Sequence, residues 1–424
     1  MSSPTFPAAR AARSRRVRLV ALLAVLGPGL VSGFADNDAG GITTYSLVGI
    51  QFGYQLLWVI LASGVALFFT QELGARLGLA TGKGMTALIR ERFGVRWVAF
   101  VVLAMLVANL GTTVAEFAGI GAALDLFGVP VPVSAAVSAV AVVVLIGWGS
   151  FGRVQYLFVA VGVAVSAAYA ISAVLAKPDW GQAVHSLFIP SGTLTTAYWL
   201  AVVGTVGTTI TPWGQGFIQA YVVDKRLDEH DLAGERLDVG LGSFLTNLIA
   251  GFIIVACAAT LWANGETTIT DAAQAAKALA PFAGPAAEVL FAVGLLAASL
   301  LGLGVVPLTS AYSTCEAFGW ELGVDWGWRD APAFYGLLAF FVGFAAVFVL
   351  IPGLPLLQVM FLSQVLNGLL LPFILVFVMV LSGDRALLGP LASGRLLLAV
   401  GWAITLALAA MSILLVVTTL APVG

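Results

Sequence analysis

The sequence contains very few charged residues. Only 9% of its 424 residues are Asp, Glu, Lys or Arg, and 60% are hydrophobic, whereas soluble domains contain about 25% charged residues. So little polar surface excludes a soluble globular fold. Cysteine is scarce as well, and the two Cys residues, Cys257 and Cys315, lie far apart in apolar segments. We predict that both are small buried side chains, because neither a disulfide framework nor a metal motif surrounds them.

Other chemical signatures are also missing. The net charge of −2 is small and the charges are sparse, so neither a nucleic-acid partner nor an acidic tail is indicated. There is no H-E-x-x-H zinc motif, and no second Asp is placed to complete an intramembrane protease dyad. We therefore expect neither an enzyme nor a bound cofactor.

Long hydrophobic runs are abundant instead. Residues 54–70, 133–148 and 396–417 approach the roughly 20 apolar residues that cross a hydrocarbon core about 30 Å thick. Hydropathy and helix breakers predict an all-α integral membrane protein of about eleven transmembrane helices in the lipid bilayer, with an oligomeric state that the sequence leaves open. The predicted spans are 18–50, 53–76, 96–124, 131–149, 154–176, 196–223, 238–262, 284–317, 333–351, 355–381 and 394–418.

Five Arg residues lie at or before the start of the first predicted span. They superficially suggest a secretory signal peptide, but no small-residue cleavage site ends a compact apolar core. We interpret residues 1–17 as an uncleaved cytoplasmic basic arm and residues 18–424 as the transmembrane domain. With the N-terminus inside, all of the 19 Lys and Arg residues except Lys177 and Lys277 fall on the inner side, in agreement with the positive-inside rule. The prediction is a multi-pass protein of the cell membrane.

Two predicted spans are interrupted in the middle by polar residues and helix breakers. The first contains ADNDAGG at 35–41, and the sixth contains GTTITPWG at 207–214. A pair of broken spans at matching places in two halves indicates inverted repeats with a substrate site between them. The predicted repeats cover about 18–176 and 196–381, and 394–418 is an additional helix.

A simple kink is the alternative explanation for Gly and Pro in a membrane helix. It does not explain two carboxylates beside a Gly-Gly pair, because an intramembrane Asp costs at least about 2.5 kcal/mol at a helix centre. Asp36 and Asp38 are the only acidic residues of the first predicted span. An unwound stretch there frees carbonyl groups, and carboxylate with carbonyl oxygen suits a hard cation.

Longer motifs resemble one known family. The run GPGLVSGFADNDAGG, followed by QFGYQLLWVILASGVALFFTQELGARLGLATGKGMTALIRERFG, resembles the first two spans and the next loop of the Nramp divalent-metal transporters. Further similar motifs are AEFAGIGAALDLFGVP in span 3, GLLAASLLGLG with TSAY in span 8, and LSQVLNGLLLPFILVFVMVLSGDRALLG in span 10. The resemblance implies a LeuT-like fold of two inverted repeats of five spans. It also implies a secondary transporter that moves a divalent metal cation, as cargo and not as cofactor, by alternating access.

The metal-binding motifs of the family match this chain only in part. The family's Asp-Pro-Gly-Asn falls on residues 38–41, so the resemblance keeps the metal-binding carboxylate as Asp38 but replaces the Asn ligand by Gly41. The family's Met-Pro-His falls on residues 211–213, where Thr211 replaces the thioether ligand and Trp213 replaces the proton-linked His.

The resemblance assigns the other site residues as follows. The backbone carbonyl ligands correspond to Ala35 and Thr208, and the polar ligand of span 10 corresponds to Gln364, for which an interhelical hydrogen bond is an alternative role. Of the two carboxylates of the proton route only Glu116 remains, either as a proton carrier or as a carboxyl bonded to a neighbouring helix. The remaining candidates, for a gate or for contacts around the ligands, are Asp36, Asn37 and Trp213.

These replacements favour a hard ion. A thioether prefers softer transition metals, whereas a Thr hydroxyl is a hard oxygen ligand. Gly41 leaves room for an ion that keeps part of its water shell, as Mg²⁺ tends to do. The combination resembles the Nramp-related magnesium transporters more than the manganese and iron carriers, and we expect Mg²⁺ or Mn²⁺ as the cargo.

Coupling to protons is not required for uptake. His185 and His230 both fall outside the predicted spans, so the usual His shuttle is missing. A divalent ion that moves inward down about 100 mV releases about 4.6 kcal/mol, enough for ~1,000-fold accumulation. We expect weak or no proton coupling. The alternatives are a small organic or amino-acid-like substrate held against Trp213 in the same fold, and a channel, which two broken helices suit less well.

Overall fold

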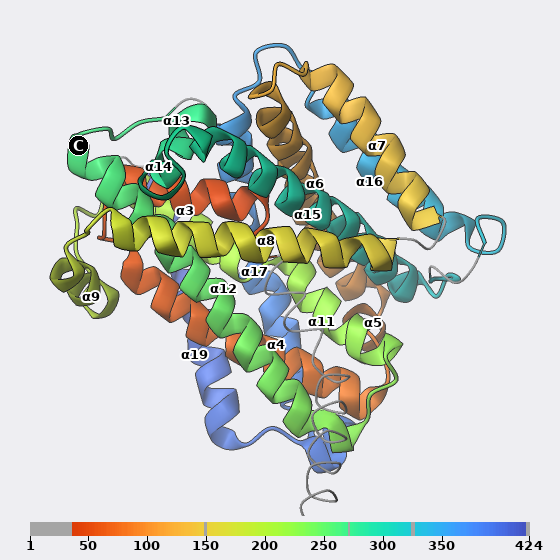
Figure 1. Ribbon diagram of the computed structural model, residues 1–424. Helices are drawn as coiled ribbons and strands as arrows, with labels where there is room; N and C mark the ends of the chain where they lie inside the picture. Colours follow the sequence, from red (N-terminus) through yellow and green to blue (C-terminus); the bar gives the residue numbers. More distant parts are fainter. Residues whose placement is uncertain (1–35, 148–150, 270–271, 324–326, 421–424) are drawn as a thin grey trace, which may run out of the picture.

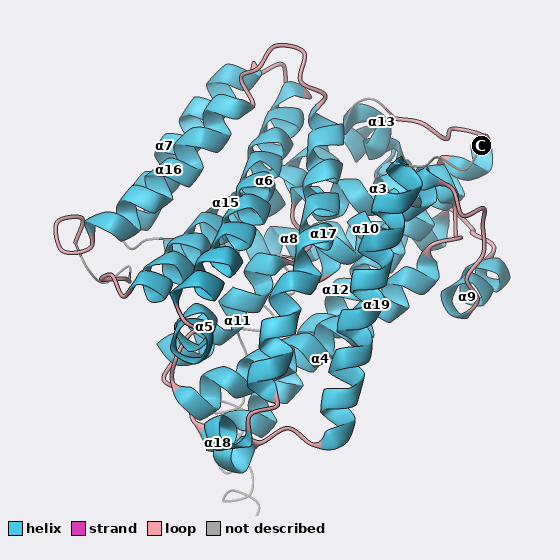
Figure 2. Ribbon diagram, turned by 180° about the vertical axis from the view of Figure 1, so that it is seen from behind, coloured by secondary structure: helices cyan, strands magenta, loops and turns pink. Residues whose placement is uncertain are grey.

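The computed structural model describes residues 36–147, 151–269, 272–323 and 327–420 (Figure 1). Helices joined by loops make up this part of the chain, and none of it forms a β-strand (Figure 2). In chain order the helices are α3 (Ala39–Phe52), α4 (Leu57–Thr81), α5 (Met85–Phe93), α6 (Val95–Asp125), α7 (Val131–Gly147), α8 (Phe151–Leu175), α9 (Trp180–Phe188), α10 (Thr196–Thr209), α11 (Pro212–Asp224), α12 (Leu232–Thr260), α13 (Ala272–Ala276), α14 (Ala280–Ala283), α15 (Ala287–Phe318), α16 (Pro332–Phe348), α17 (Leu356–Ser382), α18 (Arg385–Leu388) and α19 (Arg395–Leu420).

The predicted spans agree with these helices. Each span corresponds to one long helix, except that α10 and α11 together fill 196–223 and that only the second half of the first span, α3, lies within the described residues. By length and composition, six helical stretches of the described chain suffice to cross a membrane, namely Leu57–Thr81, Val95–Asp125, Glu229–Asn264, Ala272–Phe318, Leu356–Ser382 and Arg395–Leu420. Further apolar helices are shorter. The prediction of an all-α, multi-span membrane protein is confirmed.

The bundle is organised around α6. This helix packs along α15 and α17, and α3 packs against α12, α17 and α10, which enclose it. α7 and α16 lie side by side at one edge of the molecule (Figures 1 and 2). α19 packs on α17 and α10, and only 22% of its most apolar stretch is buried. Most of α19 therefore faces lipid, whereas α3 is central.

The break in the sixth predicted span and the helix start within the first both lie where the sequence predicts them. α10 ends at Thr209 and α11 begins at Pro212, whose fixed φ and missing N–H suit the first position of a helix. α3 begins at Ala39, directly after the turn at Asp36–Asp38. Asp38 and Thr211 occupy the N-cap positions, for which Asp and Thr are favoured because their side chains accept from free backbone N–H groups.

The loop between α4 and α5 connects α11 to α15. The Nε2 of Gln219, on α11, donates to the carbonyl of Lys83 at 2.8 Å. Thr86 Oγ1 donates to the carboxylate of Glu316, on α15, at 3.1 Å. That carboxylate lies so close to Gly84 that a Cβ there would overlap it. The loop and the first turn of α5, which belong to the first predicted repeat, thus tie together two helices of the second repeat, α11 and α15.

Candidate functional site

The starts of α3 and α11 meet through side-chain hydrogen bonds. Asp38 Oδ1 accepts from the backbone N–H of Gly41 at 2.7 Å, and Thr211 Oγ1 accepts from that of Gly214 at 3.1 Å. The same Thr211 hydroxyl donates to Asp36 Oδ1 at 3.3 Å. Asp36 therefore joins the two broken spans. Negative side chains at helix N-termini are stabilised by the helix dipole, which offsets part of the cost of burying these carboxylates.

Several oxygens at this junction are buried without a partner. Asp36, Asp38 and Thr208 are 0%, 1% and 0% exposed. Asp36 Oδ2, Asp38 Oδ2 and Thr208 Oγ1 accept or donate no hydrogen bond. Unpaired buried carboxylate oxygens cost several kcal/mol unless a positive charge compensates them. The geometry therefore supplies hard oxygen atoms with free lone pairs, which is what a cation requires.

The described residues do not form a metal site built from several His, Cys, Asp or Glu side chains. Within the described ranges, no group of three or more His, Cys, Asp or Glu side chains is placed to hold a metal ion. A cation at the junction would be held by one or two carboxylates, and hydroxyl, amide and carbonyl oxygens or water would complete its shell. Such a ligand set favours hard ions.

The two glycines at the start of α3 are required by close packing. A Cβ at Gly40 would collide with the side-chain amide of Gln364. A Cβ at Gly41 would lie 2.8 Å from the carbonyl oxygen of Asp36 and 3.2 Å from Thr208 Oγ1. A side chain at position 41 would thus press on the Asp36 carbonyl and on Thr208, so the close approach of these groups at the junction depends on glycine.

Gln364 lies at the junction and also in a hydrogen-bond chain between helices. Its amide donates to Ser363 Oγ at 3.3 Å and accepts from Asn367 Nδ2 at 2.9 Å, and the same Asn367 group donates to Thr112 Oγ1 on α6 at 2.9 Å. Both roles considered for Gln364 therefore fit its position. The sequence analysis missed Asn367 and Thr112, although Asn367 is one helical turn from Gln364 and lies on the same face.

Glu116 lies beside Asp38. Its side chain is 0% exposed, and its Oε2 accepts from the N–H of Ala39 at 3.5 Å. Its carboxyl group interacts electrostatically with the carboxyl group of Asp38. Gly302, on α15, leaves the space for it, because a Cβ there would lie 2.6 Å from the Glu116 carboxyl. Two adjacent buried carboxyl groups repel each other when both are ionised, so a proton or a cation is needed between them.

The other predicted residues are placed around this junction. Trp213 is 0% exposed in the apolar core, edge-to-face with Phe217 at 6.0 Å between ring centroids. Asn37 lines a cavity of about 30 Å³ with Tyr169, of α8, and with residues of α12 and α15; this volume suffices for about two water molecules. Ala35 lies outside the described residues.

One further contact was not found by sequence reasoning. The hydroxyl of Tyr45, on α3, lies 3.0 Å from Thr209 Oγ1 at the end of α10, and both residues are 0% exposed. Tyr45 follows Thr43 and Thr44 and precedes Ser46, and nothing in these neighbours indicates its partner. Only its spacing of seven residues from Asp38, two helical turns, would have indicated the same face.

Two half-helix starts that meet inside a bundle of membrane-spanning helices define the class of LeuT-type transporters with broken helices. A profile of the Nramp family, described as natural resistance-associated macrophage protein-like, matches residues 29–418. The chain belongs to this family.

Curated relatives cover nearly the whole chain. It is 31% identical over 399 residues to the divalent metal cation transporter MntH of Deinococcus radiodurans. This alignment covers 91% of this chain and 88% of that protein. It is also 31% identical to the MntH of Ralstonia nicotianae, over 89% of this chain and 86% of that one.

Solved structures share the fold. The manganese transporter of Eremococcus coleocola, in complex with an aromatic bis-isothiourea compound, aligns with a TM-score of 0.76 at 20% identity over 100% of this chain and 91% of that chain. MhsT in complex with L-phenylalanine aligns with a TM-score of 0.62 at 17% identity over 93% of this chain and 98% of that chain. At such identities the alignments show the fold alone, a LeuT-like arrangement.

Proposed function

We propose that the protein is a secondary transporter that carries a divalent metal cation across the cell membrane by alternating access. The observation that carries this proposal is the set of buried, unpartnered oxygens of Asp36, Asp38 and Thr208 where two broken helices meet. The family relatives named divalent metal cation transporters support it. The metal is the substrate, and the chemistry is binding and release with no bond made or broken.

In this proposal Asp38 anchors the ion by its charge. Thr208, Thr211 and Gln364 supply hard oxygens, as does the carbonyl of Ala35, and Asp36 holds the α11 side in place through Thr211. The residues match the preference of Mg²⁺ or Mn²⁺ for oxygen ligands. The small cavity at Asn37 offers room for water that the ion could retain. Mg²⁺ dehydrates reluctantly, so this cavity favours it.

We also propose that proton coupling is weak or missing. Trp213 stands where the family has a proton-linked His, and Glu116 remains as the one carboxyl of the proton route. In the proposed orientation the N-terminus and the basic arm at 1–17 are cytoplasmic. The inside-negative membrane potential then drives uptake of the divalent ion.

The test is uptake into proteoliposomes of purified protein under an imposed inside-negative potential. Mg²⁺, Mn²⁺ and Ca²⁺ are compared while the internal pH is recorded. Asp38→Asn removes the anchoring charge, and Asp125→Asn, at the exposed end of α6, is the matched control with the same change elsewhere.

We expect saturable Mg²⁺ or Mn²⁺ uptake that Asp38→Asn loses and Asp125→Asn keeps, without acidification of the lumen. Thermal unfolding of each variant shows whether it is folded. Full uptake by a folded Asp38→Asn protein would contradict the role of Asp38. If no divalent ion enters through folded wild-type protein, a small organic cargo becomes the better explanation.

A further inference from the structure

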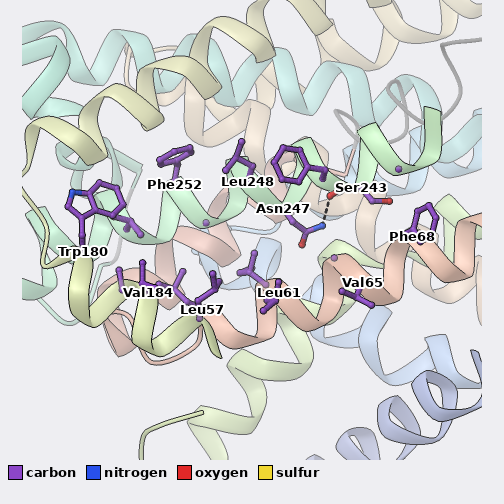
Figure 3. Close-up of a pocket in the computed structure, with 18 of the residues that line it drawn as sticks. Leu57, Leu61, Val65, Phe68, Trp180, Val184, Ser243, Asn247, Leu248 and Phe252 are labelled. Carbon is purple, nitrogen blue, oxygen red and sulfur yellow. Dashed lines mark hydrogen bonds between the residues drawn. The ribbon is translucent and has the colours of Figure 1, made fainter. Parts of the chain in front are cut away.

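A deep apolar groove runs along the flank of the molecule between α4 and α12, and α9 lies at one end of it (Figure 3). Its volume is about 570 Å³, within the roughly 300–1,000 Å³ of typical small-molecule sites. Apolar side chains such as Leu57 and Leu61 of α4 and Leu248 and Phe252 of α12 line it. None of its lining residues belongs to the proposed cation site, and the proposed transport cycle does not use the groove.

The groove opens toward the hydrocarbon of the bilayer. α4 and α12 are both long and apolar enough to span the membrane. Large apolar side chains at the rim are exposed, with Leu61 at 39%, Val65 at 50% and Phe244 at 63%. On a spanning helix such side chains face lipid. The groove is therefore continuous with the lipid-facing surface, and an aqueous ligand has no favourable route into it.

Missing side chains make the groove deep. Gly64, Gly240 and Gly251 all line it, and a Cβ at Gly251 would meet no atom within 4 Å. Packed helix interfaces leave few voids of this size, because unfilled space forfeits dispersion contacts. An occupant that fills the groove would recover those contacts.

The groove has few polar groups, and two of them, Asn247 Oδ1 and Ser243 Oγ, are buried without a hydrogen-bond partner. Asn247 Nδ2 donates to the carbonyl of Ser243 at 2.8 Å on the same helix (Figure 3). A Cβ at Gly64 would lie 2.8 Å from the Asn247 amide carbon, so this amide is packed between α4 and α12 and forms part of the floor. The rest of the lining offers no charge and no hydrogen-bond pattern for a polar ligand to read.

The length of the groove fits one leaflet. The lining residues of α4 run from Leu57 to Phe69, which corresponds to about 18 Å at 1.5 Å per residue. Half of a hydrocarbon core of about 30 Å is ~15 Å, the depth that the acyl chains of one leaflet reach. At the α9 end, the indole of Trp180 is 44% exposed. Trp at that position is typical of the level of the lipid headgroups.

We propose that this groove is a lipid-binding site that holds one acyl chain of a bilayer phospholipid, with its headgroup at the α9 end near Trp180. The bound chain fills the space between α4 and α12 and so acts as a spacer between these helices. Relative to free lipid the gain is the better packing alone, so the lipid exchanges with the bilayer but is retained through mild detergent extraction.

The first experiment is native mass spectrometry of purified full-length protein from vesicles of phosphatidylethanolamine and phosphatidylglycerol. Gly251→Phe fills the groove. Gly343→Phe, on α16, is the matched control, because a Cβ there also meets no atom within 4 Å but lies on a lipid-facing surface outside the groove. We expect wild type and Gly343→Phe to retain one phospholipid more than Gly251→Phe at equal activation energy. Equal retention by all three proteins would overturn the proposal.

The second experiment leaves α4 and α12 unchanged and probes the α9 end of the groove through Trp180. Wild type and Trp180→Phe are placed in vesicles whose phospholipids carry bromine on the acyl chain near the headgroup, and tryptophan quenching is compared. We expect the fluorescence component lost in Trp180→Phe to be quenched at least as strongly as that of Trp97, which is 54% exposed on α6. A Trp180 component shielded from brominated lipid would show that another segment of the protein occupies the groove, and would overturn the proposal. Neither readout depends on which cargo is carried.

Discussion

The two broken spans present the same local geometry with different chemistry. Both half-helices, α3 and α11, begin at a capping side chain that accepts from the N–H three residues on. The α3 side carries two carboxylates and two glycines, whereas the α11 side carries Thr211, Pro212 and Trp213, with no charge. The comparison teaches that the first span supplies the charges and the glycines. The second span supplies the neutral hydroxyl of Thr211 and the bulky side chain of Trp213. The predictions below test this division.

Removing charge from the α3 side should have the largest effect. Asp38→Asn should weaken Mg²⁺ or Mn²⁺ binding by about 100-fold, because a carboxylate that contacts a buried cation contributes a few kcal/mol. Thr211→Val should weaken it by less than ~10-fold, since a neutral ligand is lost. The measurement is the ion-dependent rise of the unfolding temperature, which follows the ratio of ion concentration to dissociation constant. Equal losses in the two variants would contradict the division.

Adding a side chain at the Gly-Gly pair that begins α3 should have the next largest effect. In Gly41→Ala the new methyl group lies 2.8 Å from the Asp36 carbonyl, so the backbone must shift at a cost of about 1–3 kcal/mol, and ion affinity should fall with stability. Gly336→Ala, on α16, has no atom within 4 Å of its Cβ and is the control. Unchanged uptake and stability in Gly41→Ala would show that the start of α3 tolerates a side chain.

Removing the N-cap of α11 should have a moderate effect, which a serine at the same position should reverse. Thr211→Ala removes the acceptor for the Gly214 N–H and should lower the free energy of unfolding by ~1 kcal/mol. Thr211→Ser keeps the hydroxyl and should restore both stability and the bond to Asp36. Chemical denaturation in mild detergent provides the measurement. If Ser fails to restore stability, the methyl group of Thr211 and not its hydroxyl holds the junction.

The tie between α11 and the α4–α5 loop should have the smallest effect. Gln219→Leu removes the hydrogen bond to the Lys83 carbonyl, worth about 0.5–1.5 kcal/mol. We expect a few-fold change in the maximal uptake rate with unchanged ion affinity, because the ligands are untouched. Gln182→Leu, on the exposed face of α9, is the control. A change of affinity instead of rate would place Gln219 in contact with the ion path.

The positions of the breaks were predictable because their causes are local. The signals act within one helical turn, so the adjacent residues in the sequence reveal them: Pro212, the Gly-Gly pair, and the caps Asp38 and Thr211. The eleven spans follow from hydropathy in the same way. The assignment of Glu116 to the proton route came only through the family resemblance, and its position beside Asp38 was not predicted.

Contacts between helices were not predictable from the residues. Asn367 with Thr112 and Tyr45 with Thr209 join segments more than a hundred residues apart. Whether such side chains meet depends on how α6, α10 and α17 rotate against one another, and apolar sequences of similar hydropathy on all faces do not encode that rotation. The groove between α4 and α12 was not predicted for the same reason. Gly251 becomes informative only when its empty surroundings are known.

The burial of the proposed cation site limits how fast single ions can pass. Asp36, Asp38 and Gln364 are 0–1% exposed, so no ion leaves by diffusion alone while the helices hold this arrangement. Each crossing must wait for helices to move apart, on a time scale of about microseconds to seconds. Ion flux through one molecule should therefore arrive as separate events paced by the protein, and raising the ion concentration beyond saturation should not increase it.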